Sequence, residues 1–219
     1  RGRAYLESHP ETTGVQGRTT VEPIDGSAAN YREFKRLEQR GFRTNNVFYR
    51  TEAVREIGGF DERFSVQRED IDLAFSLLEK GYTIDYCEDI RVEHCYRTED
   101  KWDLLKNCWN RRFDPLLYKK HPRLYRRHVG TPFPLSLASV LAAHVLVVVI
   151  GAAAPRAFLG AAAVIDIVWV TTLALRRMGH RPSSVSAFLR QAIAVAVSPF
   201  VLLWALCVGC VRARTLLVA

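Results

Sequence analysis

The pattern of apolar positions changes abruptly along the 219-residue chain. Over about the first hundred residues, short apolar groups alternate with polar residues and turns, as in short strands and helices. Three apolar runs then follow, at residues 135–154, 157–175 and 191–211. Each run has about 20 residues, the length that a helix needs to cross the hydrocarbon core of a bilayer. The sequence therefore predicts an α/β part followed by an all-α transmembrane region of two or three helices.

The clearest element of the first part is a helix with a continuous apolar face, formed by Ile71, Ala74, Phe75, Leu77 and Leu78. Gly81 provides its stop. Alternating apolar positions predict strands at 82–86 and 90–94, and shorter strands at 14–17 and 46–49. We also expect short helices that end near His9, over 31–39 and over 52–57, the last closed by Gly58 and Gly59.

The segment 101–130 links the two parts. Its large apolar residues recur at spacings of three and four, at Trp102, Leu105, Trp109, Phe113 and Leu116. This spacing predicts an amphipathic helix, and its tryptophans and arginines suit a membrane interface. The alternative is a surface helix that packs on the preceding domain.

The distribution of charge favours a membrane partner over nucleic acid. Residues 1–104 carry 16 basic and 21 acidic side chains, whereas residues 105–128 carry eight basic and one acidic. Positive charge that crowds against apolar segments is typical of binding to anionic lipids, so we expect no nucleic acid partner. The positive-inside rule places the N-terminal part in the cytoplasm and makes the chain a multi-pass protein of the cell membrane. Arg212 and Arg214 would then lie outside, unless the third run, which contains Pro199, is re-entrant or interfacial.

One dense motif carries candidate chemistry. It runs from Gly58-Gly59-Phe60-Asp61-Glu62 through Phe64 to Glu69-Asp70-Ile71-Asp72-Leu73. We expect the glycines to form a tight turn, and Phe60 and Phe64 to anchor the loop in the core. A carboxylate at the start of the following helix is favoured in its charged form by the helix dipole and can accept a proton from a hydroxyl. Acidic residues at this position also serve simply as helix caps.

The ordered set of motifs resembles the acceptor-site signature of family 2 glycosyltransferases with the GT-A fold. That signature has the form N-x-x-x-R, G-G-F-D-E, E-D-x-D-L and a strand that ends in histidine. The chain matches it with Asn46 and Arg50, residues 58–62, residues 69–73 and His94. The resemblance covers roughly residues 1–128. It implies the acceptor-side half of a GT-A-type, Rossmann-like domain at 1–100. The basic segment and the apolar runs then divide the rest of the chain into a juxtamembrane segment at 101–130 and membrane helices at 131–219, a looser match to the family's anchored members.

The resemblance also implies an activity, which is inverting transfer of a sugar from a nucleotide-diphosphate donor to an acceptor hydroxyl. Asp70 would be the catalytic base, and Glu69 and Asp72 would orient the acceptor. Asn46 and Arg50 would shape the acceptor pocket or have a structural role. His94 would contact a divalent metal (Mg²⁺ or Mn²⁺) or the donor diphosphate, or would be an ordinary strand-end histidine. The acceptor would be a polyprenyl-linked glycan or a polysaccharide, presented among membrane lipids.

Two features depart from the family pattern. Arg68 stands before Glu69, where glycine is common. The donor-binding half with its D-x-D motif is missing from this chain, so we expect a preceding N-terminal portion and poor donor binding by the chain alone. Processive synthases carry a Q-x-x-R-W element, and the chain has only Trp109-Asn110-Arg111-Arg112, which favours single transfer. The alternative function is a non-catalytic, membrane-anchored interaction or assembly module.

Overall fold

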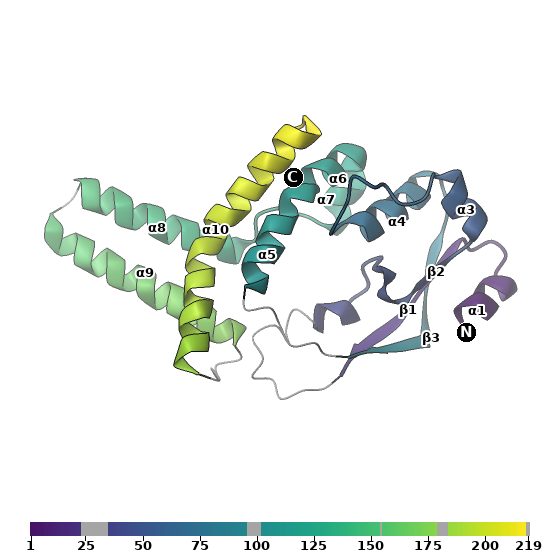
Figure 1. Cartoon of the computed structure of the whole chain (residues 1–219), viewed down its shortest axis with the longest axis horizontal. Coiled ribbons are helices and arrows are strands. Elements are labelled where there is room, and N and C mark those ends of the chain that lie inside the picture. The colour runs from purple at the N-terminus through teal and green to yellow at the C-terminus, as the bar shows by residue number, and fades with distance from the viewer. Residues whose placement is uncertain (23–34, 96–101, 154, 179–183, 218–219) are drawn as a thin grey trace.

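The computed structural model describes residues 1–22, 35–95, 102–153, 155–178 and 184–217. Figure 1 shows a small sheet with short helices at the N-terminal side and long helices at the C-terminal side. The predicted division into an α/β part and an all-α part is therefore confirmed.

The sheet has three strands in the order β2-β1-β3. Strand β1 (Gly14–Val21) pairs antiparallel with β2 (Val47–Tyr49) and parallel with β3 (Ile84–His94). The prediction of two separate strands at 82–86 and 90–94 is wrong, because both belong to β3. The register slips within β3, where Gly17 pairs with Cys87 and the next residue, Arg18, pairs with Arg91. This irregularity interrupts the alternation of apolar and polar residues along β3, which is why the sequence predicted two strands.

A glycine and a buried amide hold the irregular part of the sheet. A Cβ atom at Gly17 would lie 2.2 Å from the carbonyl oxygen of Ile90, so only glycine fits there. Asn46 is 4% exposed, and its Nδ2 donates to the carbonyl oxygens of Arg18 and Ile90, both at 3.0 Å. Carbonyls that the irregular ladder leaves unpaired thus gain a donor from a side chain.

Short helices cover the sheet. They are α1 (Gly2–Ser8), η1 (Lys35–Glu38), η2 (Thr44–Asn46), α3 (Thr51–Glu56) and α4 (Glu69–Glu79). Helix α4 matches the clearest sequence prediction, since Leu73, Ala74, Phe75 and Leu77 are buried and Gly81 follows with a φ of +87°. Part of the helix predicted over 31–39 lies outside the described residues, and the rest includes the short 3₁₀ helix η1.

The juxtamembrane segment folds as four pieces and not as the continuous helix predicted from 102 to 116. These are α5 (Asp103–Asn110), η3 (Arg111–Phe113), α6 (Asp114–Lys120) and α7 (Pro122–His128). Pro115 and Pro122 each lie in the first turn of a new helix, where proline is tolerated. Phe113, Leu117 and Tyr125 form one core cluster with Phe64 and Phe75. The segment therefore packs on the α/β part, and its contact with a membrane stays a prediction.

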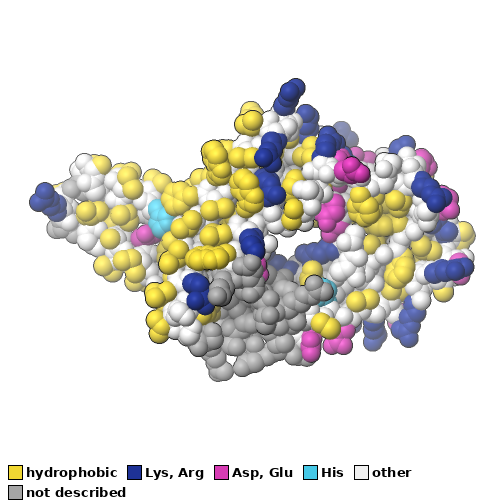
Figure 2. All heavy atoms as spheres, in the orientation of Figure 1, with side chains coloured by type: hydrophobic (Ala, Val, Ile, Leu, Met, Phe, Trp, Pro, Cys, Tyr) yellow, Lys and Arg dark blue, Asp and Glu magenta, His cyan; other side chains and the backbone are white. Residues whose placement is uncertain are grey.

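Three further helices are long and apolar enough to cross a membrane, namely α8 (Leu135–Ala153), α9 (Arg156–Arg177) and α10 (Val185–Ala213). Apolar side chains cover much of their surface (Figure 2). Figure 1 shows α8 and α9 as a hairpin, with α10 crossing it steeply and running past α5 toward α6. Helix α10 begins before the predicted residue 191 and continues through Pro199 as one helix. The Lys119 ammonium donates to the carbonyl of Ala213 at 2.8 Å, so α10 ends beside α6.

A polar cluster joins the three long helices. The Nδ1 of His144 lies 2.8 Å from Oδ2 of Asp166, and its Nε2 lies 3.1 Å from the carbonyl oxygen of Ala196. Pro199 cannot donate to the carbonyl of Val195, and the Ser198 hydroxyl donates to that oxygen instead, at 2.8 Å. Each helix thus contributes a polar atom to contacts within an otherwise apolar region.

Candidate active site at the start of helix α4

The loop between α3 and α4 begins with two glycines in the left-handed region. Gly58 and Gly59 have φ values of +85° and +77°, and their N–H groups bond to carbonyls of the last turn of α3. Phe64 is 4% exposed and anchors the loop in the core, as predicted. The same prediction for Phe60 is wrong, because its side chain is 50% exposed. The loop has no regular secondary structure, so residue spacing could not predict which of its two phenylalanines points into the core.

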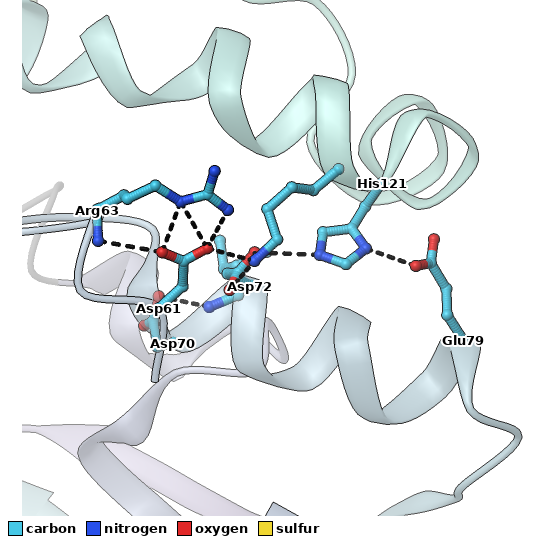
Figure 3. Close-up of polar contacts among 8 residues, drawn as sticks. Asp61, Arg63, Asp70, Asp72, Glu79 and His121 are labelled. Atoms are coloured by element: carbon cyan, nitrogen blue, oxygen red, sulfur yellow. Dashed lines mark hydrogen bonds and ion pairs between the residues drawn. The ribbon is translucent and has the colours of Figure 1, made fainter. Parts of the chain in front are cut away.

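Asp61 fastens this loop to α6. Its carboxylate accepts from the Arg63 guanidinium and from the Lys120 ammonium, the latter at 2.7 Å (Figure 3). These hydrogen bonds, above all those from Arg63, hold the pKa of Asp61 well below its usual range. Asp61 therefore stays charged and structural at any pH near neutrality.

Asp72 occupies the centre of the same row of charged side chains (Figure 3). Its side chain is 2% exposed and lies 2.7 Å from Lys120 Nζ and 3.1 Å from His121 Nε2. The other ring nitrogen of His121 lies 2.7 Å from Glu79 Oε2 at the far end of α4. This geometry favours a structural role for Asp72, in which it holds α4 against α6, over the predicted contact with an acceptor.

Arg68 precedes α4 with a φ of 81°, a conformation that favours glycine. Its guanidinium forms a bidentate pair with Asp114, whose carboxylate is fully buried. Asp114 also accepts from Arg111 and from the Tyr125 hydroxyl. Arg68 therefore adopts a backbone conformation that is unfavourable for a residue with a side chain, and its buried ion pair with Asp114 of α6 compensates for that cost.

Asp70 lies in the first turn of α4 and is half-buried. Its Oδ1 accepts from the N–H of Ile71 at 2.8 Å, and it forms no ion pair with any residue that the structure describes. Burial raises the pKa of Asp70, and Glu69 adds to the effect, while Ile71 N–H, Arg68 and Arg43 oppose it. Burial therefore opposes the preference for the charged form that the helix dipole alone predicts. A carboxylate with a raised pKa is a stronger base toward a hydroxyl.

Three residues close to Asp70 in the sequence or linked to it electrostatically have a buried polar atom that lacks a hydrogen-bond partner among the described residues. Two of these atoms, Gln67 Oε1 and Glu69 Oε2, come from the loop and the start of α4, and a third is the Tyr49 hydroxyl of β2. Burial and the charge of Asp70 both raise the pKa of Tyr49. Buried polar atoms normally find a partner, so an unsatisfied group of this kind suits a hydroxyl-rich ligand. The residue after Asp70, Ile71, lines a cavity of about 440 Å³ together with Phe42 and Phe75.

Sequence reasoning missed Arg43 and Tyr49 as neighbours of Asp70. No motif letter marks either residue, although the strand predicted over 46–49 includes Tyr49. Both lie close enough to Asp70 for its charge to act on their pKa, although each is more than 20 residues away in the sequence. That long-range approach leaves no trace in local spacing.

The remaining predicted site residues hold the backbone. Arg50 donates to the carbonyls of Thr12 and His9, and Asn46 bonds to the irregular part of the sheet as described above. The structural alternative is thus supported for both. His94 lies at the end of β3, with its Nδ1 3.0 Å from the carbonyl oxygen of Cys95.

The described residues do not fit a divalent metal by themselves. Within them, no three His, Cys, Asp or Glu side chains gather closely enough to hold an ion. His94 would supply a single ligand, which is too few for Mg²⁺ or Mn²⁺.

Residues 38–217 match the sequence profile of a protein family described as Glycosyl transferase family group 2. The matched range includes the loop, α4 and all three long apolar helices. Neither a curated protein nor a solved structure matched the chain.

Proposed function

The chain belongs to glycosyl transferase family group 2, and we propose that it forms the acceptor side of a membrane-anchored, inverting glycosyltransferase. The observation that carries this proposal is the state of Asp70. It is a half-buried carboxylate with a raised pKa and no ion pair among the described residues, and the adjacent Glu69 has a buried oxygen without a partner among them.

In the proposed step, Asp70 takes the proton of an acceptor hydroxyl. The oxygen then attacks the anomeric carbon of the donor sugar, and the bond from that carbon to the nucleotide diphosphate breaks. Attack opposite the leaving group inverts the anomeric configuration, and the diphosphate leaves with the bonding electron pair. Glu69 would accept from a second acceptor hydroxyl, a role supported by its buried Oε2, which lacks a partner among the described residues. Orientation of this kind supplies part of the rate by holding the reacting oxygen near the base.

Enzymes of this family often use a divalent metal with the donor diphosphate. We propose that His94 contributes to that region and that the other ligands lie outside the described residues. The metal would neutralise charge on the leaving diphosphate.

The acceptor is proposed to reach Asp70 from the membrane surface. The long apolar helices support membrane association, and the basic residues of α6 and α7 favour the cytoplasmic side for the α/β part. We propose that α8 and α9 cross the cell membrane and that α10, which packs on them and ends beside α6, does not cross it completely. A polyprenyl-linked glycan or a polysaccharide at this surface is the acceptor class that fits.

The test is Asp70→Asn in the full-length protein. We expect turnover to fall by at least ~100-fold, since general-base catalysis contributes that much, while donor binding measured by calorimetry is retained. Glu52→Gln, on exposed α3, is the matched control and should turn over normally. Unchanged turnover in Asp70→Asn would remove Asp70 as the base. A product with the donor's anomeric configuration, seen by NMR, would contradict inversion.

A further inference from the structure

A basic pocket lies at the C-terminal end of α10, separate from Asp70. Its volume is about 430 Å³, and its cationic side chains are Arg63, Arg112, Lys119, Arg212 and Arg214. Its apolar lining includes Phe113 and Leu116. The loop before α4, the juxtamembrane helices and α10 thus each contribute to one cavity that combines positive charge with an apolar wall.

The cations of this α10 pocket are incompletely neutralised. Arg63 is paired with Asp61, and Lys119 bonds to the Ala213 carbonyl. Among the residues that the structure describes, no carboxylate pairs with Arg112, Arg212 or Arg214.

Arg112 is half-buried and packs against two aromatic rings. Its guanidinium lies 4.9 Å from the centre of the Trp109 ring and 4.5 Å from that of Phe113. Burial and the nearby Arg212 lower the pKa of Arg112. The fold therefore holds two like charges together, which an anion between them would stabilise.

The position of the pocket indicates what kind of anion it takes. It lies where an apolar helix of 29 residues ends against the basic juxtamembrane segment. An exposed apolar stripe on α10, which includes Val197, Phe200, Trp204 and Val211, leads along the helix to this end. The guanidinium groups can bond to phosphate in a bidentate manner. A molecule with a phosphate and a hydrocarbon chain matches both surfaces.

We propose that the α10 pocket binds the phosphate of a membrane lipid headgroup. The lipid tail lies along the apolar stripe of α10, and the phosphate lies between Arg112 and Arg212. The bound lipid links α10 to the loop before α4, because Arg63 of that loop lines the same cavity. This site does not depend on the proposed transfer reaction.

The test compares the protein in nanodiscs of phosphatidylcholine alone and with added phosphatidylglycerol. We expect phosphatidylglycerol to raise the Tm by roughly 5 °C, the size of shift that a saturating ligand gives. The pair R212Q/R214Q should lose this shift. The matched control, R123Q/R127Q, removes two exposed charges of α7 outside the pocket and should keep it.

Three outcomes would overturn the proposal. Equal loss of the shift in both pairs would show a general attraction of basic residues to the membrane. The same shift from inorganic phosphate in phosphatidylcholine discs would assign the pocket to free phosphate. A lower Tm of R212Q/R214Q in phosphatidylcholine alone would show that these arginines hold the fold together, since relief of repulsion around Arg112 predicts an unchanged or higher Tm.

Discussion

The guanidinium of Arg68 donates to both carboxylate oxygens of Asp114, at 2.7 and 3.3 Å, although the two residues lie 46 positions apart. Arg68 directly precedes the helix that carries Asp70, and Asp114 begins α6. The N-terminus of α4, which carries Asp70, is therefore held in place by the juxtamembrane segment as well as by the α/β part.

Substitution of Arg68 separates its two contributions. Arg68→Gly keeps the left-handed backbone and loses the ionic contact, and loss of one partner of a buried pair costs about 3 kcal/mol. Arg68→Ala loses the contact and also strains the backbone by roughly a further 1 kcal/mol. We expect thermal unfolding in nanodiscs to rank native above R68G and R68G above R68A. Equal stability of the two variants would contradict the backbone argument.

The pH dependence of transfer should report the environment of Asp70. The base must be ionised, so activity falls as the pH drops through its pKa. Burial raises that pKa, and the acid limb of kcat/KM therefore lies at higher pH than for an ordinary aspartate. Arg43 lowers the same pKa, so Arg43→Gln should move the limb to still higher pH. Arg55→Gln, an exposed change on α3, should leave the pH of the acid limb unchanged. If Arg43→Gln also leaves it unchanged, Arg43 does not lower the pKa of Asp70.

Gly209 sets the approach of α10 to the juxtamembrane segment. A Cβ atom there would lie 2.2 Å from the carbonyl oxygen of Arg112 and 2.9 Å from Cγ of Pro115. We expect Gly209→Ala to destabilise the protein by about 1–3 kcal/mol through overpacking, and so to lower its Tm. At Gly160 on α9 the added carbon meets no atom within 4 Å, so Gly160→Ala should be neutral or slightly stabilising. A similar Tm change at both sites would contradict the close contact.

Cysteine labelling can determine on which side α10 ends. Because Ala213 bonds to Lys119 of α6, a cysteine at Leu216 should share the side of the α/β part. A cysteine at Ala152, near the turn between α8 and α9, should lie on the opposite side. Both substitutions are made in a variant without the five native cysteines and labelled from outside the cell. Labelling at 152 but not at 216 is expected, and equal labelling would show that α10 crosses the membrane.

Local sequence patterns correctly predicted the elements in which apolar residues recur at a regular spacing. The apolar face of α4, its stop near Gly81 and the two glycines after α3 all follow from neighbouring residues, and the structure confirms them. The order of the motifs was likewise enough to identify the family.

Contacts across long stretches of chain were beyond such patterns. The prediction that Asp72 orients the acceptor follows from its position in the motif, two residues after Asp70. Its partners Lys120 and His121 lie 48 and 49 residues away, and only the folded chain brings them to it. The predictions for Phe60 and for two separate strands in place of β3 were wrong because irregular backbone has no period to extrapolate.

Asp166 is the one acidic residue after residue 128, and it faces His144 of the preceding helix. A lone aspartate at the centre of a helix that enters lipid costs about 3 kcal/mol during insertion by the translocon. A histidine within reach on α8 offsets that cost only if both helices enter together. On the proposed topology the two helices would therefore enter the bilayer together, with α9 depending on His144 of α8.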